Sequence, residues 1–211
     1  MGRLIIEAMR EEDIPQVLEI EREAFSLAWS EGAYRRELRW NRLARYLILK
    51  EKNDNSSERE PVEVPKGERL GTRILSLLRR APAPVATGDL VLGYAGQWLM
   101  VDESHLITIA MREDYRRRGL GEALLIAAID QAVEAGARIM TLEVRASNLG
   151  AQELYEKFDF KKVGLRPRYY TDNNEDAVLM TSDILTSAAF QSRLKQLREE
   201  SQRKVGLLWS L

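Results

Sequence analysis

The chain has 211 residues, of which 45% are hydrophobic and 31% are charged, and its formal net charge is −1. This composition is typical of one globular domain with or without an appendage, and it gives no global reason to expect nucleic acid or a membrane as a partner. The sequence holds no cysteine and one histidine, which excludes disulfides, a thiolate metal site and a cysteine nucleophile, and argues against a histidine-based metal site. There is neither a long apolar stretch nor a signal-peptide pattern, so we expect a cytoplasmic protein.

Hydrophobic periodicity predicts an α/β fold with a mixed sheet. We expect strands at residues 3–10, 45–52, 89–101, 104–112 and 138–145, followed by two more in "KKVGLRPRYYT" and "DAVLMTSDI". We expect helices at 11–25, in "SEGAYRRELRW", at about 119–135, in "SNLGAQELYEKFDF" and from about residue 187 onward. The predicted organisation is therefore a domain over residues 1–185 and a C-terminal helical extension over 186–211.

Residues 53–89 have a different composition from the rest of the chain. They hold four of the six prolines and many small polar residues, which is typical of a loop. The stretch "TRILSLLRR" within them has the pattern of a short basic amphipathic helix. We interpret the whole segment as a solvated insertion between two strands.

The stretch "RRRGLGE" at residues 116–122 stands between a predicted strand and a predicted helix. The first amides of a helix lack partners and the helix dipole is positive there, so such a turn favours an anion. Gly119 and Gly121 would let a phosphate approach the backbone, and the three arginines add charge. A surface turn of solvated arginines is the alternative.

Two familiar phosphate motifs fit poorly. The P-loop pattern is absent. A dinucleotide fingerprint would match Gly119 and Gly121 and has an acidic residue, Glu143, near the right distance, but Leu124 stands where its third glycine belongs.

Four blocks, in this order along the chain, carry a resemblance to a known family: "EREAFSLAWSEGAY", "RRRGLG", "TLEVRASNLGAQELYEKFDF" and "RYYTDNNEDAVLM". They resemble the GNAT acyltransferase superfamily, and within it the RimI-type protein N-terminal acetyltransferases. The resemblance covers about residues 3–52 and 89–183. It implies the GNAT fold, a mixed sheet of six to seven strands flanked by helices with a splayed central strand pair, and acetyl-CoA as cofactor.

The resemblance also implies residue roles on the cofactor side. A bulge at 109–111 would splay the strand, and a main-chain N–H near Met111 would stabilise the thioester oxyanion. Asn148 would contact the cofactor, or would simply cap a helix. The expected cofactor-binding residues are Ile109, Ala110, Met111, Arg116, Arg117, Arg118, Gly119, Leu120, Gly121, Glu122 and Asn148.

Glu143, Tyr155 and His105 are the expected catalytic residues. A glutamate inside an apolar strand is costly unless it is paired or used, so Glu143 is either the general base or a buried partner of a nearby arginine such as Arg145 or Arg168. The resemblance makes Tyr155 the general acid for the departing thiolate, although such a tyrosine is often a core residue. The resemblance also allows His105 to assist the base; the alternative is an exposed, structural histidine.

The chemistry of the amine favours an α-amine as substrate. At pH 7 an α-amino group costs roughly 1 kcal/mol to deprotonate, whereas a lysine costs about 4–5 kcal/mol. Because the chain has no cysteine, direct attack in a ternary complex is expected. The resemblance places Trp29, Tyr169 and Tyr170 beside the substrate.

The leading hypothesis is acetylation of a protein or peptide N-terminus, with the N-terminal alanine of a small-subunit ribosomal protein as the substrate that the resemblance suggests. The first alternative is a GNAT enzyme that acetylates a small-molecule amine or a lysine. The second is a non-catalytic acyl-CoA-binding module. The sequence leaves the oligomeric state open, and we expect no metal.

Overall fold

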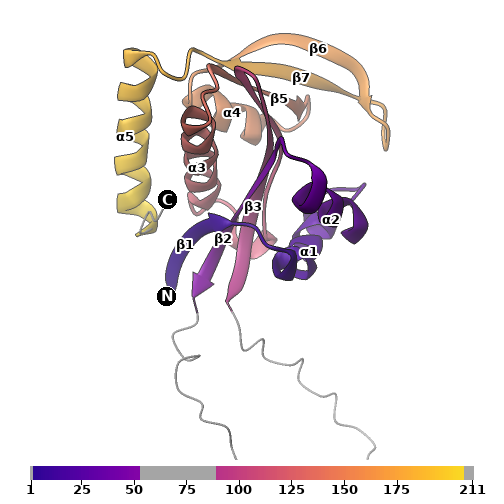
Figure 1. Cartoon of the computed structure of the whole chain (residues 1–211). Coiled ribbons are helices and arrows are strands. Elements are labelled where there is room, and N and C mark those ends of the chain that lie inside the picture. Colours follow the sequence, from indigo (N-terminus) through magenta and orange to yellow (C-terminus); the bar gives the residue numbers. More distant parts are fainter. Residues whose placement is uncertain (1, 53–88, 207–211) are drawn as a thin grey trace, which may run out of the picture.

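The computed structural model describes residues 2–52 and 89–206, which form one seven-stranded sheet with helices on both faces (Figure 1). The strand order is β1-β2-β3-β4-β5-β7-β6, and every neighbouring pair is antiparallel except β4 and β5. The strands are β1 (Arg3–Ala8), β2 (Ala44–Lys52), β3 (Leu90–Met100), β4 (Glu103–Met111), β5 (Ile139–Arg145), β6 (Phe160–Tyr170) and β7 (Glu175–Ser182). The predicted mixed α/β sheet is confirmed.

The helices also follow the predicted order. They are α1 (Ile14–Ala24), α2 (Glu31–Trp40), α3 (Leu120–Glu134), α4 (Leu149–Lys157) and α5 (Ala188–Val205), with short 3₁₀ turns η1 (Glu11–Asp13) and η3 (Glu113–Tyr115). Helices α1 and α2 cover one face of the sheet, and α3 and α5 cover the other (Figure 1). The predicted "TRILSLLRR" helix and the last five residues lie outside the described residues.

Side-chain caps fix where two of these helices begin. The Ser30 hydroxyl accepts a hydrogen bond from the Ala33 amide at 3.2 Å, and the Asn148 side chain accepts one from the Ala151 amide at 3.1 Å. Both bonds satisfy amides that have no partner within the helix. After α3 the chain passes through Gly136 at φ +87°, a left-handed conformation that favours glycine.

The core has two parts, one on each face of the sheet. On the α1–α2 side, Ile14, Val17 and Ile20 of α1 pack on Ile48 of β2 and Tyr94 of β3. On the other side α3 is apolar around most of its circumference because it lies between the sheet and α5. Burial of this kind contributes about 1.5–3 kcal/mol for each large side chain.

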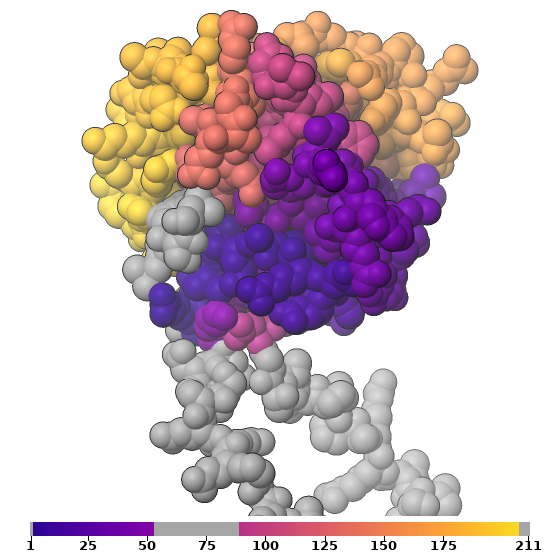
Figure 2. Space-filling model, in the orientation of Figure 1, coloured from indigo at the N-terminus to yellow at the C-terminus, as the bar shows by residue number. Residues whose placement is uncertain are grey.

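The C-terminal helix packs on its own chain. Phe190, Leu194 and Leu197 of α5 belong to the same buried cluster as α3. In the space-filling view α5 (yellow) forms one side of the molecule and the β6–β7 region (orange) the opposite upper side, while the N-terminal elements (indigo to violet) fill the front (Figure 2). Among the described residues, none of the helices combines the length and the apolar character needed to cross a bilayer.

The central strands β4 and β5 pair over only part of their length. Pairing joins residues from Glu103 to Leu106 with residues from Ile139 to Leu142, and beyond it the two strands no longer pair with each other. The predicted splay of the central pair is therefore confirmed. Its consequence is an open gap between the last residues of β4 and those of β5.

The predicted position of the bulge was wrong. The register between β3 and β4 shifts between Gly96 and Gln97, which leaves Ile107 as the extra residue, whereas 109–111 pair regularly with β3. Gly96 explains the position, because the Tyr46 ring lies 2.3 Å from where its Cβ would be, so only glycine fits here. A glycine within a strand often marks such a bulge.

Candidate active site

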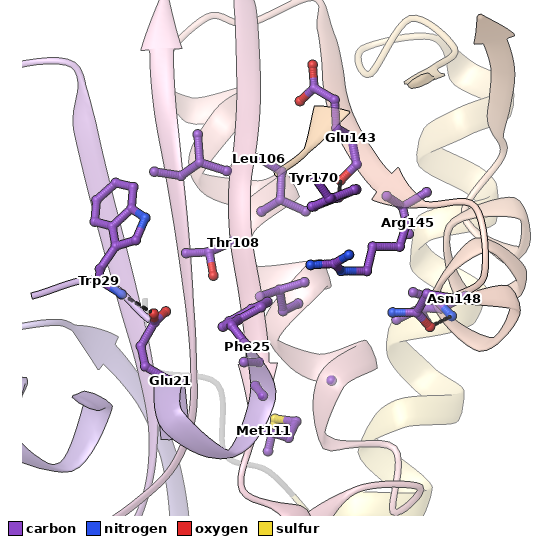
Figure 3. Close-up of a pocket in the computed structure, with 18 of the residues that line it drawn as sticks. Glu21, Phe25, Trp29, Leu106, Thr108, Met111, Glu143, Arg145, Asn148 and Tyr170 are labelled. Atoms are coloured by element: carbon purple, nitrogen blue, oxygen red, sulfur yellow. Dashed lines mark hydrogen bonds between the residues drawn. The ribbon is translucent and has the colours of Figure 1, made fainter. Parts of the chain in front are cut away.

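A pocket of about 520 Å³ lies where β4 and β5 diverge. Figure 3 shows Glu21 and Trp29 on one side, Arg145 and Asn148 on the opposite side, Glu143 above and Met111 below. The lining includes Glu21, Phe25, Leu27, Trp29, Tyr34, Thr108, Ile109, Ala110, Met111, Arg116, Gly121, Glu143, Arg145, Asn148, Tyr155 and Tyr170. It therefore joins residues from α1, the α1–α2 connection, β4, the start of α3, β5, α4 and β6.

The turn before α3 presents free backbone donors. Gly119 is the N-cap residue at φ +84°, and the first backbone bond of the helix runs from the Ala123 amide to the Gly119 carbonyl at 3.3 Å. Within the described residues, the amides of 117–122 donate to no backbone or side-chain acceptor. Together with the positive end of the α3 dipole, these six amides fit a diphosphate.

Three arginines surround this turn in different ways. Arg116 donates from Nε to the Met111 carbonyl at 3.2 Å and from Nη2 to the Glu23 carbonyl at 3.3 Å, which ties the turn to the ends of β4 and α1. Arg118 lies over the Tyr115 ring at 4.9 Å. Arg117 adopts φ +61°, and its guanidinium lies near Gly150 at the start of α4.

The amide of Met111 points into the gap between β4 and β5. Arg112 donates its amide to the Leu92 carbonyl of β3 at 2.9 Å. In an antiparallel pair the backbone groups of successive residues face opposite sides, so the amides of Met111 and Ile109 face away from β3. An acyl chain in the gap would therefore meet the backbone amides of Met111 and Ile109.

Glu143 stands on β5 with its side chain 7% exposed. One carboxylate oxygen lies 3.0 Å from His105 Nε2, and the other lies 3.1 Å from a guanidinium nitrogen of Arg166. The expected pairing with a nearby arginine is present, but the examples named were wrong, because Arg145 pairs with Asp172 and Glu175 of the β6–β7 hairpin instead. The backbone amide of Arg168 binds Asp176.

Tyr155 reaches the pocket from α4 and is 5% exposed. Burial raises the pKa of its phenol above the ordinary value, so the hydroxyl stays protonated at neutral pH. No hydrogen bond within the described part of the chain uses this hydroxyl. The phenol therefore carries a proton that no described acceptor holds, at the position where the pocket ends on α4.

Tyr170 closes the pocket from β6. Its hydroxyl lies 3.5 Å from the Glu143 carbonyl, and the Arg145 guanidinium stacks 3.9 Å from its ring (Figure 3). Burial raises the pKa of Tyr170 to about 12, although Arg145 acts in the opposite direction. Tyr169 packs edge-on against Tyr170 at 5.2 Å between centroids.

Glu21 is a pocket residue that the sequence interpretation missed. It is 2% exposed; one carboxylate oxygen accepts hydrogen bonds from the Tyr34 and Tyr94 hydroxyls, and the other accepts from the Trp29 amide at 2.8 Å. A signal existed, since Glu21 follows Val17 by four residues and so falls on the apolar face of α1.

The other predicted residues differ in how close they come to the pocket. In the described part of the chain His105, Arg117, Arg118, Gly119, Leu120, Glu122 and Tyr169 do not line it. His105 lies behind Glu143, Leu120 is buried in the core, and Glu122 pairs with Lys157 at 2.7 Å. Asn148 both lines the pocket and caps α4, so its two proposed roles are compatible.

Sequence and structure comparisons identify the relatives of this chain. A Bacillus subtilis (strain 168) protein, provisionally named as a ribosomal protein bS18-alanine N-acetyltransferase, is 34% identical over 172 residues, which cover 82% of this chain and 90% of that protein. The ribosomal protein bS18-alanine N-acetyltransferase of Escherichia coli (strain K12) is 44% identical over 88 residues, covering 41% of this chain and 60% of that protein.

Comparison with solved structures finds the same kind of relatives. The crystal structure of the ribosomal-protein-S18-alanine N-acetyltransferase from Escherichia coli matches with a TM-score of 0.62 and 27% identity, covering 88% of this chain and 96% of that one. The NatC complex bound to Gag peptide and CoA shares the fold, with a TM-score of 0.60 at 19% identity over 86% of this chain and 99% of that one. The model of the Acetyltransferase (GNAT) family matches residues 14–160. With its splayed sheet and the open amide turn before α3, the chain belongs to the GNAT family of acetyltransferases.

Proposed function

We propose that the chain transfers an acetyl group from acetyl-CoA to the N-terminal α-amine of a protein or peptide. The observation that carries this proposal is that Glu143, Tyr155 and the Met111 end of β4 line one and the same pocket. The relatives named as bS18-alanine and N-alpha-acetyltransferases support the same amine class. By the same comparison, an alanine-starting N-terminus of a small-subunit ribosomal protein is the proposed substrate.

The turn before α3 would hold the cofactor's diphosphate. The amides of 117–122 would donate to it, and Arg116, Arg117 and Arg118 would add positive charge. Acetyl-CoA supplies the acetyl group as a reactive thioester. The amide of Met111 would stabilise the negative charge that develops on the carbonyl oxygen.

Glu143 would remove a proton from the incoming ammonium group. The resulting neutral nitrogen forms a bond to the carbonyl carbon as the carbon–sulfur bond breaks, and Tyr155 would give a proton to the departing sulfur. The phenol recovers a proton from the newly acylated nitrogen or from water. The products are an N-acetylated peptide, coenzyme A and one released proton.

Two aromatic residues that line the pocket, Trp29 and Tyr170, would hold the peptide. Trp29 lies in the connection between α1 and α2, and Tyr170 lies on β6. An extended peptide end would enter the pocket between these two side chains. The rigid link between Glu21 and the Trp29 amide would fix one wall of this entrance.

Mass spectrometry of peptides incubated with the protein and acetyl-CoA tests the proposal. One peptide begins with alanine, and a matched peptide carries a blocked N-terminus and a free lysine. We expect acetylation of the first peptide at its α-amine and none of the second. Acetylation of the lysine peptide or of polyamines alone would contradict the proposal.

A further inference from the structure

Four polar side chains form one chain of contacts on the face of β4 and β5 that carries Glu143. Glu103 and His105 come from β4, and Thr141 and Glu143 come from β5. The parallel register places His105 opposite Thr141. Because side chains alternate between the faces of a strand, residues two apart on each strand share this face.

The distances along the chain are short throughout. Glu143 Oε2 lies 3.0 Å from His105 Nε2, His105 Nδ1 lies 2.8 Å from Thr141 Oγ1, and Thr141 Oγ1 lies 2.5 Å from Glu103 Oε1. His105 is 22% exposed and Glu143 is 7% exposed, so the pair is largely shielded from water.

The direction of these hydrogen bonds follows from the donors available. A carboxylate only accepts, so the one hydroxyl hydrogen of Thr141 points to Glu103. Thr141 Oγ1 is then left to accept from His105, which requires a hydrogen on His105 Nδ1. A neutral His105 held this way has no hydrogen on Nε2, so its 3.0 Å contact with Glu143 Oε2 joins two acceptors and is a place where one proton can bind.

We propose that Thr141 and Glu103 are positioning residues that fix the tautomer of His105 so that Glu143 and His105 together receive the proton of the substrate amine. The proposal rests on the proposed role of Glu143 as base. The proton leaves the ammonium nitrogen and comes to lie between Glu143 Oε2 and His105 Nε2. The amine becomes neutral, and the charge of the Glu143–His105 pair rises by one. The proton returns to water after the transfer.

Loss of the Thr141 hydroxyl would remove this arrangement. His105 would then be free to carry its hydrogen on Nε2 and to donate it to Glu143. The position between Glu143 Oε2 and His105 Nε2 would then already hold a hydrogen. The remaining lone pair, on Nδ1, would point away from the substrate. Arg166, Tyr169 and Tyr170 of β6 also face this region, and all three remain unchanged in such a variant.

Nuclear magnetic resonance of ¹⁵N-labelled histidine tests the tautomer directly, because His105 is the only histidine in the chain. The full-length protein should show a protonated Nδ1. In Thr141→Val and in Glu103→Ala we expect the hydrogen to move to Nε2, whereas Thr141→Ser should keep the original signature. Thr181→Val, at the β7 position paired with Thr141, is the matched control and should change nothing.

Kinetics with the alanine peptide provide the second measurement. Thr141→Val should lower kcat about tenfold or more, with the KM for acetyl-CoA unchanged, and Thr141→Ser should restore it. An unprotonated Nδ1 or a hydrogen already present on Nε2 in the unsubstituted protein, or an unaltered kcat in Thr141→Val, would overturn the proposal. If the unsubstituted protein acetylated no α-amine, the proposed function and the catalytic part of this inference would both fail, while the spectrum would still decide the hydrogen-bond direction.

Discussion

Gly119 at the start of α3 and Val205 at the end of α5 are neighbours in space. A Cβ added at Gly119 would lie 3.4 Å from Val205 Cγ2. The two residues are far apart in sequence, and Val205 lies beyond the segment that the family model matches. The C-terminal helix therefore covers one side of the turn proposed for the diphosphate.

Substitutions at Gly119 should separate backbone strain from cofactor binding. Gly119→Ala forces a left-handed residue and should cost about 1–2 kcal/mol of stability, while Gly119→Asp should also abolish binding of coenzyme A by charge repulsion. Thermal unfolding and calorimetry measure the two effects. Gly206→Ala, at φ +64° with open space around it, is the control and should cost similar stability with unchanged affinity. Full affinity in a folded Gly119→Asp protein would refute the site.

Glu143→Gln should lower kcat by about 10²- to 10⁴-fold, because it removes the proton acceptor and keeps the size of the side chain. Calorimetry should show unchanged affinity for acetyl-CoA. The exposed Glu153→Gln is the matched control and should leave kcat unaltered. Equal activity in both variants would show that Glu143 is not the base.

Tyr155→Phe removes one hydroxyl from a buried ring that also packs on Phe160 at 5.8 Å. We expect kcat to fall while the KM for peptide and the melting temperature stay nearly constant, because no described hydrogen bond depends on this hydroxyl. Steady-state kinetics and thermal unfolding test this. Tyr115→Phe serves as control outside the pocket, and a Tyr155→Phe enzyme with normal kcat would assign proton donation to another group.

Glu21→Gln should weaken peptide binding and lower the stability of the folded protein. The amide can replace only one of the two acceptor oxygens, so a buried donor among Tyr34, Tyr94 and the Trp29 amide loses its partner, at a cost of about 1–3 kcal/mol. We expect a higher KM for peptide and an unaltered KM for acetyl-CoA. A change confined to the acetyl-CoA KM would contradict this account of the Trp29 wall.

Acid should destabilise the β6–β7 hairpin through Glu175. Hydrogen bonds from Ser147, with further ones from Asn173 and Arg145, lower the pKa of Glu175 from 4.5 to about 2. A lowered pKa in the folded state contributes stability above about pH 4.5, and this contribution is lost as the pH falls toward 2. Denaturant unfolding of the natural chain and of Glu175→Gln across this range should show a shallower pH dependence in the variant. Identical slopes would rule out Glu175 as a contributor.

The sequence alone was sufficient for much of the site because its signals are local. The strand, arginine–glycine turn and helix around Gly119 lie within a few residues of one another. The caps at Ser30 and Asn148 are also local, because each accepts from an amide three residues further along. Periodicity also gave the type and order of the described elements. The family resemblance then connected Glu143 and Tyr155 to one pocket, and both line it.

Tertiary structure decided what depends on residues distant in sequence. Arg166, rather than Arg145 or Arg168, pairs with Glu143, because the register and bulges of β6 determine which arginine reaches β5. The bulge falls at Ile107 because the Tyr46 ring of β2 packs over Gly96. The contact of His105 with Thr141 likewise follows from the parallel pairing of β4 with β5. These relationships arise from strand register and side-chain packing in three dimensions, and the local sequence pattern does not encode either of them.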